Sequence, residues 1–299
     1  MCIIYEECFS QKYYAGNGKT IKSSITDQKI KRNYRLYLPE NYFPSKAMPL
    51  LIVLHGRFGT GKGMIRFAAF NPLADKEGII IAYPDGYKRS WHDARNHGPA
   101  SDKGIDDVAF ISRLIDTISA RYAVDRSRVY VAGMSNGGFM ALTLACALPD
   151  KIAAVASVTG SMAPDPGSWC KPDKAVSILL IPGTMDPIVP FTGGEISNGN
   201  KTIAFSAVAD FWAENNKCNK APVLINLPDN FNDGTSVRKI FYTACEQNST
   251  VEMYCITGGG HTWPGGLQYL PEARIGRVCK EIQAEEIIVH FLLQHQNPR

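Results

Sequence analysis

The sequence predicts an α/β fold in which helices cover both faces of a mostly parallel central sheet, and three observations predict it. Short apolar runs that suit buried strands alternate with longer helical patterns along the chain. The run LLIVL at residues 50–54 is continuously apolar, as a strand buried on both faces requires. Ser135 stands between a strand pattern and a helix pattern, which is the order strand, turn, helix.

The individual elements follow from the same patterns. Asp106 is expected to cap a helix over residues 107–122, because apolar side chains recur there at helical spacing. Further helices are expected at residues 139–148, 203–215 and 281–294. Strands are expected at residues 33–38, 50–54, 79–83, 128–132, 153–158, 177–181, 237–242 and 251–256. Residues 226–235 read as a turn-rich surface loop. The expected organisation is an N-terminal extension (1–29) followed by one catalytic domain (30–299).

The strand-to-helix turn carries the first chemical signal. Gly133-Met134-Ser135-Asn136-Gly137 fits G-x-S-x-G, the sharp turn that presents a nucleophilic serine at the edge of a sheet. Both glycines are expected because a Cβ there would clash or require an unfavourable φ. Glycine and serine also form ordinary turns, so the pentapeptide needs a base and an acid elsewhere in the chain.

A histidine after the serine supplies the candidate base. His261 follows the expected strand 251–256 in the glycine-rich run TGGGHTWPGG, whereas His290 and His295 fall in the closing helix. The candidate acid is Asp186, because it follows the expected strand 177–181 and the chain order serine, acid, histidine is then satisfied. The other acids between the serine and the histidine have less suitable positions: Asp173 precedes that strand, Asp210 lies in a helix and Asp229 in the surface loop.

Two backbone N–H groups should stabilise the oxyanion of an acyl-transfer reaction. Asn136 directly follows the serine, and Arg57 lies in the loop after the early strand 50–54, so these two residues are the candidate donors. His55 is expected to be structural. The run GTGK is not a phosphate-binding loop, because Gly63 follows Lys62 where serine or threonine is needed.

Composition fits an enzyme of one domain and excludes several other classes. The chain has 299 residues, 45% of them hydrophobic, and a formal net charge of +4. The small basic cluster at Lys29, Lys31 and Arg32 suits a solvated strand edge, so no nucleic-acid partner is expected. No apolar run is long enough to span a bilayer. None of the eight cysteines forms a C-x-x-C pair, so no metal and no cofactor are expected, and their number favours disulfides over buried thiols.

Six runs together resemble one family: HGRFGT, YPDGYKRSWHD, GIDDVAFISRLID, RVYVAGMSNGGFMALTLAC, PGTMDPIVPFTGG and GGGHTWPGG. The chain resembles the α/β-hydrolase esterases grouped as polyhydroxybutyrate depolymerase-like proteins and the feruloyl or acetylxylan esterases of carbohydrate esterase family one. The resemblance covers about residues 30–295. It implies Ser135 as nucleophile, Asp186 as acid, His261 as base and Asn136 as an oxyanion donor, in agreement with the analysis above.

The resemblance also implies disulfides and a cellular location. It implies that Cys218 pairs with Cys245 and that Cys146 pairs with Cys170; it leaves open the pairing of Cys2, Cys8, Cys255 and Cys279. Such bonds and the secretion of many relatives favour an extracellular or periplasmic protein, although residues 1–14 lack the pattern of a secretory signal.

The function expected is therefore a serine esterase acting on hydroxyalkanoate oligomers or on feruloyl and other acyl esters. Trp263 and Trp91 are candidates for an apolar wall beside the substrate, with structural packing as the alternative for each. Two other functions remain open: a serine peptidase of the same fold, and a binding protein that has kept the scaffold without catalysis.

Overall fold

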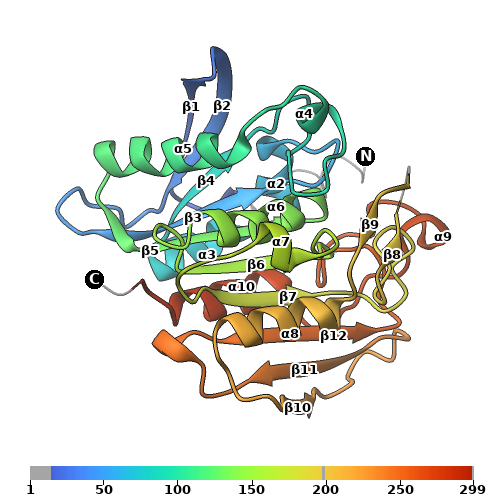
Figure 1. The fold of residues 1–299 in the computed structure, drawn as a ribbon. Helices are drawn as coiled ribbons and strands as arrows, with labels where there is room; N and C mark the ends of the chain where they lie inside the picture. The colour runs from blue at the N-terminus through green and yellow to red at the C-terminus, as the bar shows by residue number, and fades with distance from the viewer. Residues whose placement is uncertain (1–14, 197–198, 298–299) are drawn as a thin grey trace.

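A computed structural model describes residues 15–196 and 199–297. Its main feature is a ten-stranded sheet with the strand order β1-β2-β4-β3-β5-β6-β7-β12-β11-β10 (Figure 1). The strands are β1 (Lys19–Asp27), β2 (Ile30–Leu38), β3 (Met48–Leu54), β4 (Ile80–Pro84), β5 (Val124–Met134), β6 (Ala154–Val158), β7 (Ser177–Ile181), β10 (Val223–Asn226), β11 (Ser236–Tyr242) and β12 (Val251–Thr257). A separate two-stranded sheet pairs β8 (Gly194–Glu195) with β9 (Lys201–Thr202).

The centre of the sheet is parallel and both of its edges are antiparallel. Strands β4, β3, β5, β6, β7 and β12 pair in parallel, whereas β1 and β2 pair antiparallel at one edge and β10 and β11 at the other. The chain passes from β3 to β4 in one direction and then returns to place β5 on the other side of β3. The loops that leave the carboxyl ends of β3 and β5 therefore diverge from adjacent strands, and such a switch point is where open α/β sheets bind ligands.

Helices cover both faces of this sheet, and two apolar clusters form the core. On one face, α5 (Asp107–Arg121), α6 (Asn136–Ala147) and α8 (Phe205–Asn215) pack on the sheet, as the ribbon shows (Figure 1). On the other face lie α2 (Gly61–Phe67), α3 (Phe70–Glu77) and α10 (Ala284–Leu293). The shorter helices are α4 (Pro99–Asp102), α7 (Pro166–Trp169), the 3-10 turn η2 (Glu246–Asn248) and α9 (Glu272–Ile275). The predicted fold class is confirmed.

Some elements differ from the sequence prediction. Residues 19–27 lie in the predicted extension, yet they form β1 and pair with β2 along their full length. Helices α2 and α3 were not predicted, and neither was β10, whose four residues are all exposed. The predicted cap of α5 is confirmed, because the Asp106 carboxylate accepts a hydrogen bond of 2.8 Å from the N–H of Ala109.

Both implied disulfides are present, one linking Cys146 to Cys170 and the other Cys218 to Cys245. The first joins α6, which contains Cys146, to the segment after α7, and the second joins the segment just after α8 to the segment just after β11. Cys255 and Cys279 carry free thiols, and Cys2 and Cys8 lie outside the described residues. Among the described helices, we find none with both the length and the apolar character needed to cross a bilayer.

Candidate active site

Ser135 occupies the turn between β5 and α6. Its backbone has φ 54° and ψ −122°, a conformation that a residue with a side chain rarely adopts. Its N–H donates to the carbonyl of Val158, 2.8 Å away at the end of β6, which holds the turn in place. Backbone strain of this kind persists only when the surroundings enforce it, and it is a recurrent property of nucleophile turns.

The two glycines of the pentapeptide are needed for close packing rather than for a positive φ. A Cβ on Gly133 would lie 2.2 Å from the carbonyl oxygen of Gly137, because the strand passes directly beneath the first turn of α6. A Cβ on Gly137 would lie 2.4 Å from the carbonyl oxygen of Leu54, the last residue of β3. Of the two reasons predicted for these glycines, steric clash is the one that the structure bears out.

His261 and Asp186 meet across neighbouring strands. Asp186 lies in the loop after β7, and His261 in the loop after β12, the strand that pairs in parallel with β7. The Nδ1 of His261 lies 2.7 Å from Oδ2 of Asp186, and both residues are buried. Because a carboxylate only accepts, Nδ1–H is the donor, and Nε2 remains for another partner. The N–H groups of Ile188 and Val189 donate to Oδ1 of the same carboxylate at 2.8 Å, which fixes its orientation.

The histidine loop is fixed by backbone contacts at glycines. A Cβ on Gly183 would lie 2.3 Å from the carbonyl oxygen of Gly259, so the aspartate loop and the histidine loop touch backbone to backbone. A Cβ on Gly260 would lie 2.2 Å from the carbonyl oxygen of Ile275 and 2.4 Å from the Cα of Gly276. The N–H of Gly260 also donates to the carbonyl of Arg277 at 2.9 Å. The position of the His261 ring therefore depends on segment 275–277.

Ser135 and His261 line one cavity of about 630 Å³ at the carboxyl edge of the sheet. Residues from separate loops and from α2 form its apolar wall, namely Phe58, Met64, Phe67, Ile188, Tyr269 and Leu270. The hydroxyl of Tyr269 donates to the carbonyl of His261 at 2.8 Å, so part of this wall is tied to the histidine loop. Burial raises the pKa of the Tyr269 phenol to about 12, so the hydroxyl remains a donor. The cavity can therefore accept a largely apolar group next to the serine.

Asn136 and Arg57, the candidate oxyanion donors, also line this cavity. Asn136 is the first residue of α6, so its N–H has no acceptor within the helix and lies at the positive end of the helix dipole. In the loop after β3, the N–H groups of Phe58 and Gly59 donate to the carbonyls of Arg89 and Gly56. The N–H of Arg57 has no acceptor among the residues that the structure describes.

His55 is fully buried, and both of its ring nitrogens have backbone partners. Nδ1 lies 2.8 Å from the carbonyl oxygen of Gly56, and Nε2 accepts from the N–H of Gly86 at 2.9 Å. Burial lowers the pKa of this imidazole, so the ring is neutral with its proton on Nδ1. This position agrees with the structural role predicted for His55.

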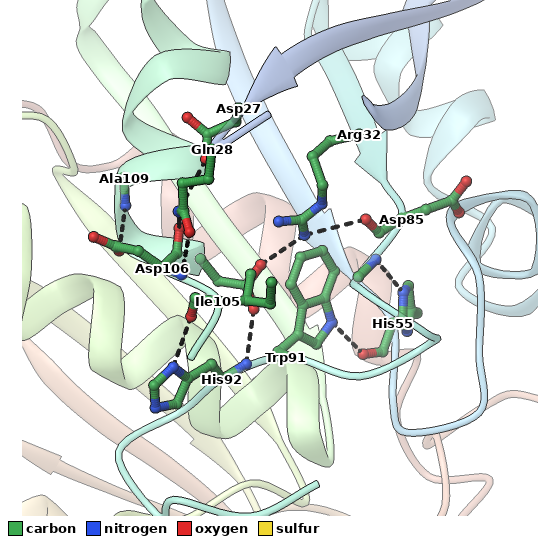
Figure 2. A network of polar contacts seen from close by, with 12 residues as sticks. Asp27, Gln28, Arg32, His55, Asp85, Trp91, His92, Ile105, Asp106 and Ala109 are labelled. Atoms are coloured by element: carbon green, nitrogen blue, oxygen red, sulfur yellow. Dashed lines mark hydrogen bonds and ion pairs between the residues drawn. The ribbon is translucent and has the colours of Figure 1, made fainter. Parts of the chain in front are cut away.

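A network of hydrogen bonds supports the loop after β3, which contains His55 and Arg57, and Trp91 is central to this network (Figure 2). The indole N–H of Trp91 donates to the carbonyl of His55 at 2.8 Å. The Asn136 amide accepts from the N–H of Trp91 at 2.8 Å and donates to the carbonyl of Trp91 at 3.0 Å and to Oδ2 of Asp93 at 2.7 Å. The side chain of Asn136 therefore links the first turn of α6 to residues 91–93, and Trp91 extends this link to His55.

The same network reaches the buried ion pair between Arg32 of β2 and Asp107 of α5. Arg32 Nη2 lies 2.6 Å from Oδ1 of Asp107. The same nitrogen lies 3.4 Å from the carbonyl oxygen of Asp85, a contact that Figure 2 draws. Oδ2 of Asp107 accepts from the N–H of His92 at 2.8 Å. Burial raises the pKa of Asp107, and the neighbouring guanidinium opposes that rise. Residues 91–93 are thus anchored to both β2 and α5.

The structure does not bring the two tryptophans to the cavity wall. Trp91 lies beneath His55, with a ring-centroid separation of 4.9 Å, and is fully buried. Trp263 packs edge-on against Phe67 and Phe70 and donates its indole N–H to Glu285 at 3.0 Å. Both tryptophans therefore occupy the packing position that the sequence left as an alternative.

Other aromatic side chains take the place at the cavity that was predicted for the tryptophans. Phe58, Phe67 and Tyr269 line the cavity, and the sequence analysis did not single them out. Phe58 directly follows the candidate donor Arg57, and this adjacency was a signal that the sequence offered; in the structure the Phe58 side chain is 68% exposed.

Comparison with known proteins defines the family. A family model described as "Putative esterase" matches residues 23–262, which is most of the chain and contains the segments of Ser135, Asp186 and His261. The chain belongs to this esterase family. The expectation of a carboxylic ester hydrolase is thereby confirmed, and the alternative of a binding protein without catalysis is not supported.

Two curated relatives are similar to this chain in sequence, and one solved structure is similar to it in fold. The chain is 30% identical to "Putative esterase NocK" of Nocardia uniformis subsp. tsuyamanensis, over 88% of this chain and 79% of that protein. It is 32% identical to feruloyl esterase B of Piromyces equi, over 75% of this chain but 41% of that protein. The acetyl xylan esterase of Aspergillus awamori matches in fold with a TM-score of 0.59 and 15% identity, over 92% of this chain and 99% of that chain.

Proposed function

We propose that the esterase hydrolyses carboxylic esters through Ser135 as nucleophile, His261 as general base and Asp186 as the acid that orients it. The observation that carries the proposal is the placement of a strained serine turn and an aspartate-bonded histidine in one cavity. A serine hydroxyl is a weak nucleophile until a base accepts its proton, and an imidazole whose Nδ1–H is held by a carboxylate has Nε2 free for this purpose.

The proposed reaction has two halves. In the first, His261 accepts the Ser135 proton, the serine oxygen attacks the ester carbonyl, and the N–H groups of Asn136 and Arg57 stabilise the oxyanion. His261 then donates the proton to the leaving alcohol, and an acyl-enzyme remains. In the second half, water attacks the acyl-enzyme with His261 again as base, which releases the carboxylic acid and restores Ser135.

The proposed substrates are esters with a compact apolar part, either hydroxyalkanoate oligomers or feruloyl and other acyl esters. The apolar wall of the 630 Å³ cavity supports this range, and so does the naming of relatives as feruloyl esterases. The cavity wall is built largely from aliphatic and aromatic side chains, which suit an acyl chain or an aromatic ring equally well.

The test is ester hydrolysis by the wild type and by Ser135→Ala, with p-nitrophenyl acetate and butyrate as substrates. We expect kcat/KM to fall at least 1,000-fold in the variant, because a triad lacking its nucleophile retains only the contribution of the oxyanion hole and of binding. Thermal unfolding should change little. A purified, folded variant that keeps more than a tenth of the wild-type activity would exclude Ser135 as nucleophile. A matched panel of peptide amides would reveal peptidase activity.

We also propose that the esterase works outside the cytosol, in the periplasm or the extracellular space. The two disulfides support this, because such bonds persist in oxidising compartments. Each closes a loop of similar length, with sequence separations of 24 and 27 residues, and should stabilise the fold by about 3 kcal/mol. Alkylation of the unfolded, unreduced protein isolated from its native source, followed by peptide mapping, tests this: protection of Cys146, Cys170, Cys218 and Cys245 supports export, and alkylation of all four contradicts it.

A further inference from the structure

One end of the cavity differs from the rest in its chemistry. Arg57, Ser90, Arg95 and His97 line it, with Arg57 bonded to His97 and with Gly98 beside both Arg57 and Ser90, while the remaining wall is largely apolar. These polar residues come from the loop after β3 and from the segment between β4 and α4. Polar groups placed in an apolar pocket usually fix the orientation of a ligand, so their partners within the protein are informative.

Arg57 provides the one cationic charge of this end that no carboxylate neutralises among the described residues. Arg95 binds Asp93 through two hydrogen bonds of 2.9 and 2.6 Å, so its charge is paired. His97 Nε2 accepts a hydrogen bond from Arg57 Nη1, and desolvation together with the two arginines lowers the pKa of His97, which keeps it neutral. Arg57 lies over the ring of Phe58, 5.1 Å from its centroid, and forms no ion pair in the described part of the chain.

Two buried donors at this end lack a protein acceptor. Nε of Arg57 and Oγ of Ser90 are both buried without a hydrogen-bond partner among the described residues, and Ser90 is 2% exposed. Both flank Gly98, whose φ is 93°. A Cβ on Gly98 would lie 3.1 Å from Ser90 Oγ and 3.8 Å from Cζ of Arg57. A buried donor without an acceptor destabilises the fold, and both residues line the cavity, so an acceptor on a ligand would offset that cost.

We propose that Arg57 and Ser90 bind a carboxylate of the substrate, so that the esterase prefers esters that also carry a free carboxylate. This inference rests on the proposed function and narrows its substrate class. A single unpaired guanidinium with an adjacent hydroxyl suits a monoanion, and a planar carboxylate accepts two hydrogen bonds from a guanidinium. A phosphate dianion would leave one negative charge unpaired at this site.

The position of Arg57 also limits the spacing between the two groups that are recognised. Its N–H is a proposed oxyanion donor and its guanidinium is the proposed carboxylate site, so the ester carbonyl oxygen and the carboxylate lie no farther apart than one extended arginine side chain plus a hydrogen bond at each end. The free-acid dimer of a 3-hydroxyalkanoate has this spacing, and so does the half-ester of a short dicarboxylic acid. An alkyl ferulate has no such carboxylate. The inference therefore favours the hydroxyalkanoate type of substrate over the feruloyl type.

The test compares each acid with its neutral amide, which has nearly the same shape. Ethyl hydrogen succinate and ethyl succinamate place the charge on the acyl side, whereas 3-acetoxybutanoate and 3-acetoxybutanamide place it on the alcohol side. We expect wild type to prefer the acid in at least one pair, and Arg57→Gln to reduce that acid-to-amide ratio of kcat/KM by about 30-fold. Ser90→Ala should reduce the ratio by about fivefold. Arg66→Gln, which changes an exposed arginine on α2, serves as the matched control and should leave the ratio unchanged.

The acid-to-amide ratio of kcat/KM reports on recognition of the carboxylate alone, because a general loss of activity in a variant lowers both values equally. No preference for the acid in either pair, or a preference that survives both Arg57→Gln and Ser90→Ala, would overturn the carboxylate site. If Arg57→Gln does not fold, two other measurements replace it: the acid-to-amide ratio of Ser90→Ala, and inhibition of wild type, which should be stronger with succinate than with succinamide. Residual hydrolysis of the neutral amides by Ser135→Ala would instead overturn the proposed function itself.

Discussion

The loops on either side of Ser135 are held in different ways. Buried polar side chains fix the loop of Gly56 and Arg57, through Trp91, Asn136 and the ion pair beneath them. The loop of His261 is fixed by backbone contacts at glycines, with segment 275–277 packed against it. Side-chain bonds can be removed one at a time, whereas a backbone contact at glycine admits no side chain at all. Single substitutions should therefore cause graded losses of stability and activity near the loop of Arg57, but large losses at the glycines near the loop of His261.

The largest effect is expected on the histidine side. Gly260→Ala would place a Cβ 2.2 Å from the carbonyl oxygen of Ile275, so the two segments must separate. Because the ring of His261 would move with its loop, we expect at least a 100-fold loss of kcat together with destabilisation by about 3 kcal/mol. Ester kinetics and urea unfolding measure both. Gly167→Ala is the control, since its added Cβ meets nothing within 4 Å; similar behaviour of the two variants would refute the packing argument.

On the polar side, the largest single effect should come from the ion pair. Asp107→Asn leaves the Arg32 guanidinium buried beside a neutral amide and should lower the free energy of unfolding by about 3 kcal/mol. Glu246→Gln breaks an exposed pair with Lys217 and should change it by less than about 1 kcal/mol. Urea unfolding of both variants gives the comparison. Equal losses would show that burial does not determine the contribution of the Arg32 pair.

The stability of the fold should depend on pH through His295, which contacts Thr250 just before β12. Burial lowers the pKa of His295 to about 4, below its ordinary value of 6.5, and its Nε2 lies 3.0 Å from Oγ1 of Thr250. The unfolded chain therefore binds a proton that the folded chain refuses between these values, and stability falls as the pH drops through this window. At pH 5 the loss relative to pH 7.5 should be about 2 kcal/mol.

His295→Gln isolates this contribution, because glutamine does not titrate. The difference in unfolding free energy between pH 7.5 and pH 5 should be smaller in the variant than in wild type by that amount. His290→Gln, at an exposed position of α10, the helix that ends just before His295, should behave as wild type. The same pH dependence in wild type and His295→Gln would assign the acid sensitivity to other groups.

The smallest effect should come from a single bond of the polar side. Trp91→Phe removes the indole N–H that binds the His55 carbonyl and should lower stability by about 1 kcal/mol. Because this bond supports the loop of Arg57, kcat should also fall, by about tenfold. Trp169→Phe removes a comparable bond to the carbonyl of Pro164, remote from the cavity, and should leave kcat unchanged. Equal kcat values for the two variants would mean that Trp91 does not position the oxyanion loop.

The sequence was most informative where a function depends on the residue that follows a strand. Ser135, Asp186 and His261 each come shortly after a run that is visibly a buried strand, and parallel strands bring their carboxyl ends to one edge. The candidate site could therefore be proposed without tertiary information, and the fold brings its residues to one edge of the sheet. The glycines that pack the histidine loop were visible as a run, but their contacts with segment 275–277 were not.

Elements with weak local signals escaped prediction. Helix α2 begins with Gly61 and Gly63, which disfavour a helix, although Thr60 caps it. Helix α3 follows Ala69 in a left-handed conformation and has no side-chain cap. The positions of Trp91 and Trp263 depended on which face of a loop is buried, and local sequence carries no such information. The same holds for Phe67 and Tyr269, which lie far apart in the chain and meet only in the folded cavity.

Covalent labelling tests most directly whether Ser135 is the nucleophile of the esterase. A fluorophosphonate transfers its phosphonyl group to an activated serine, and peptide mapping by mass spectrometry locates the adduct. The cavity contains a second serine, Ser90, which makes the location informative. One equivalent of label on Ser135, absent from His261→Gln, is the predicted result. A label on Ser90, or labelling of Ser135 that does not depend on His261, would contradict it.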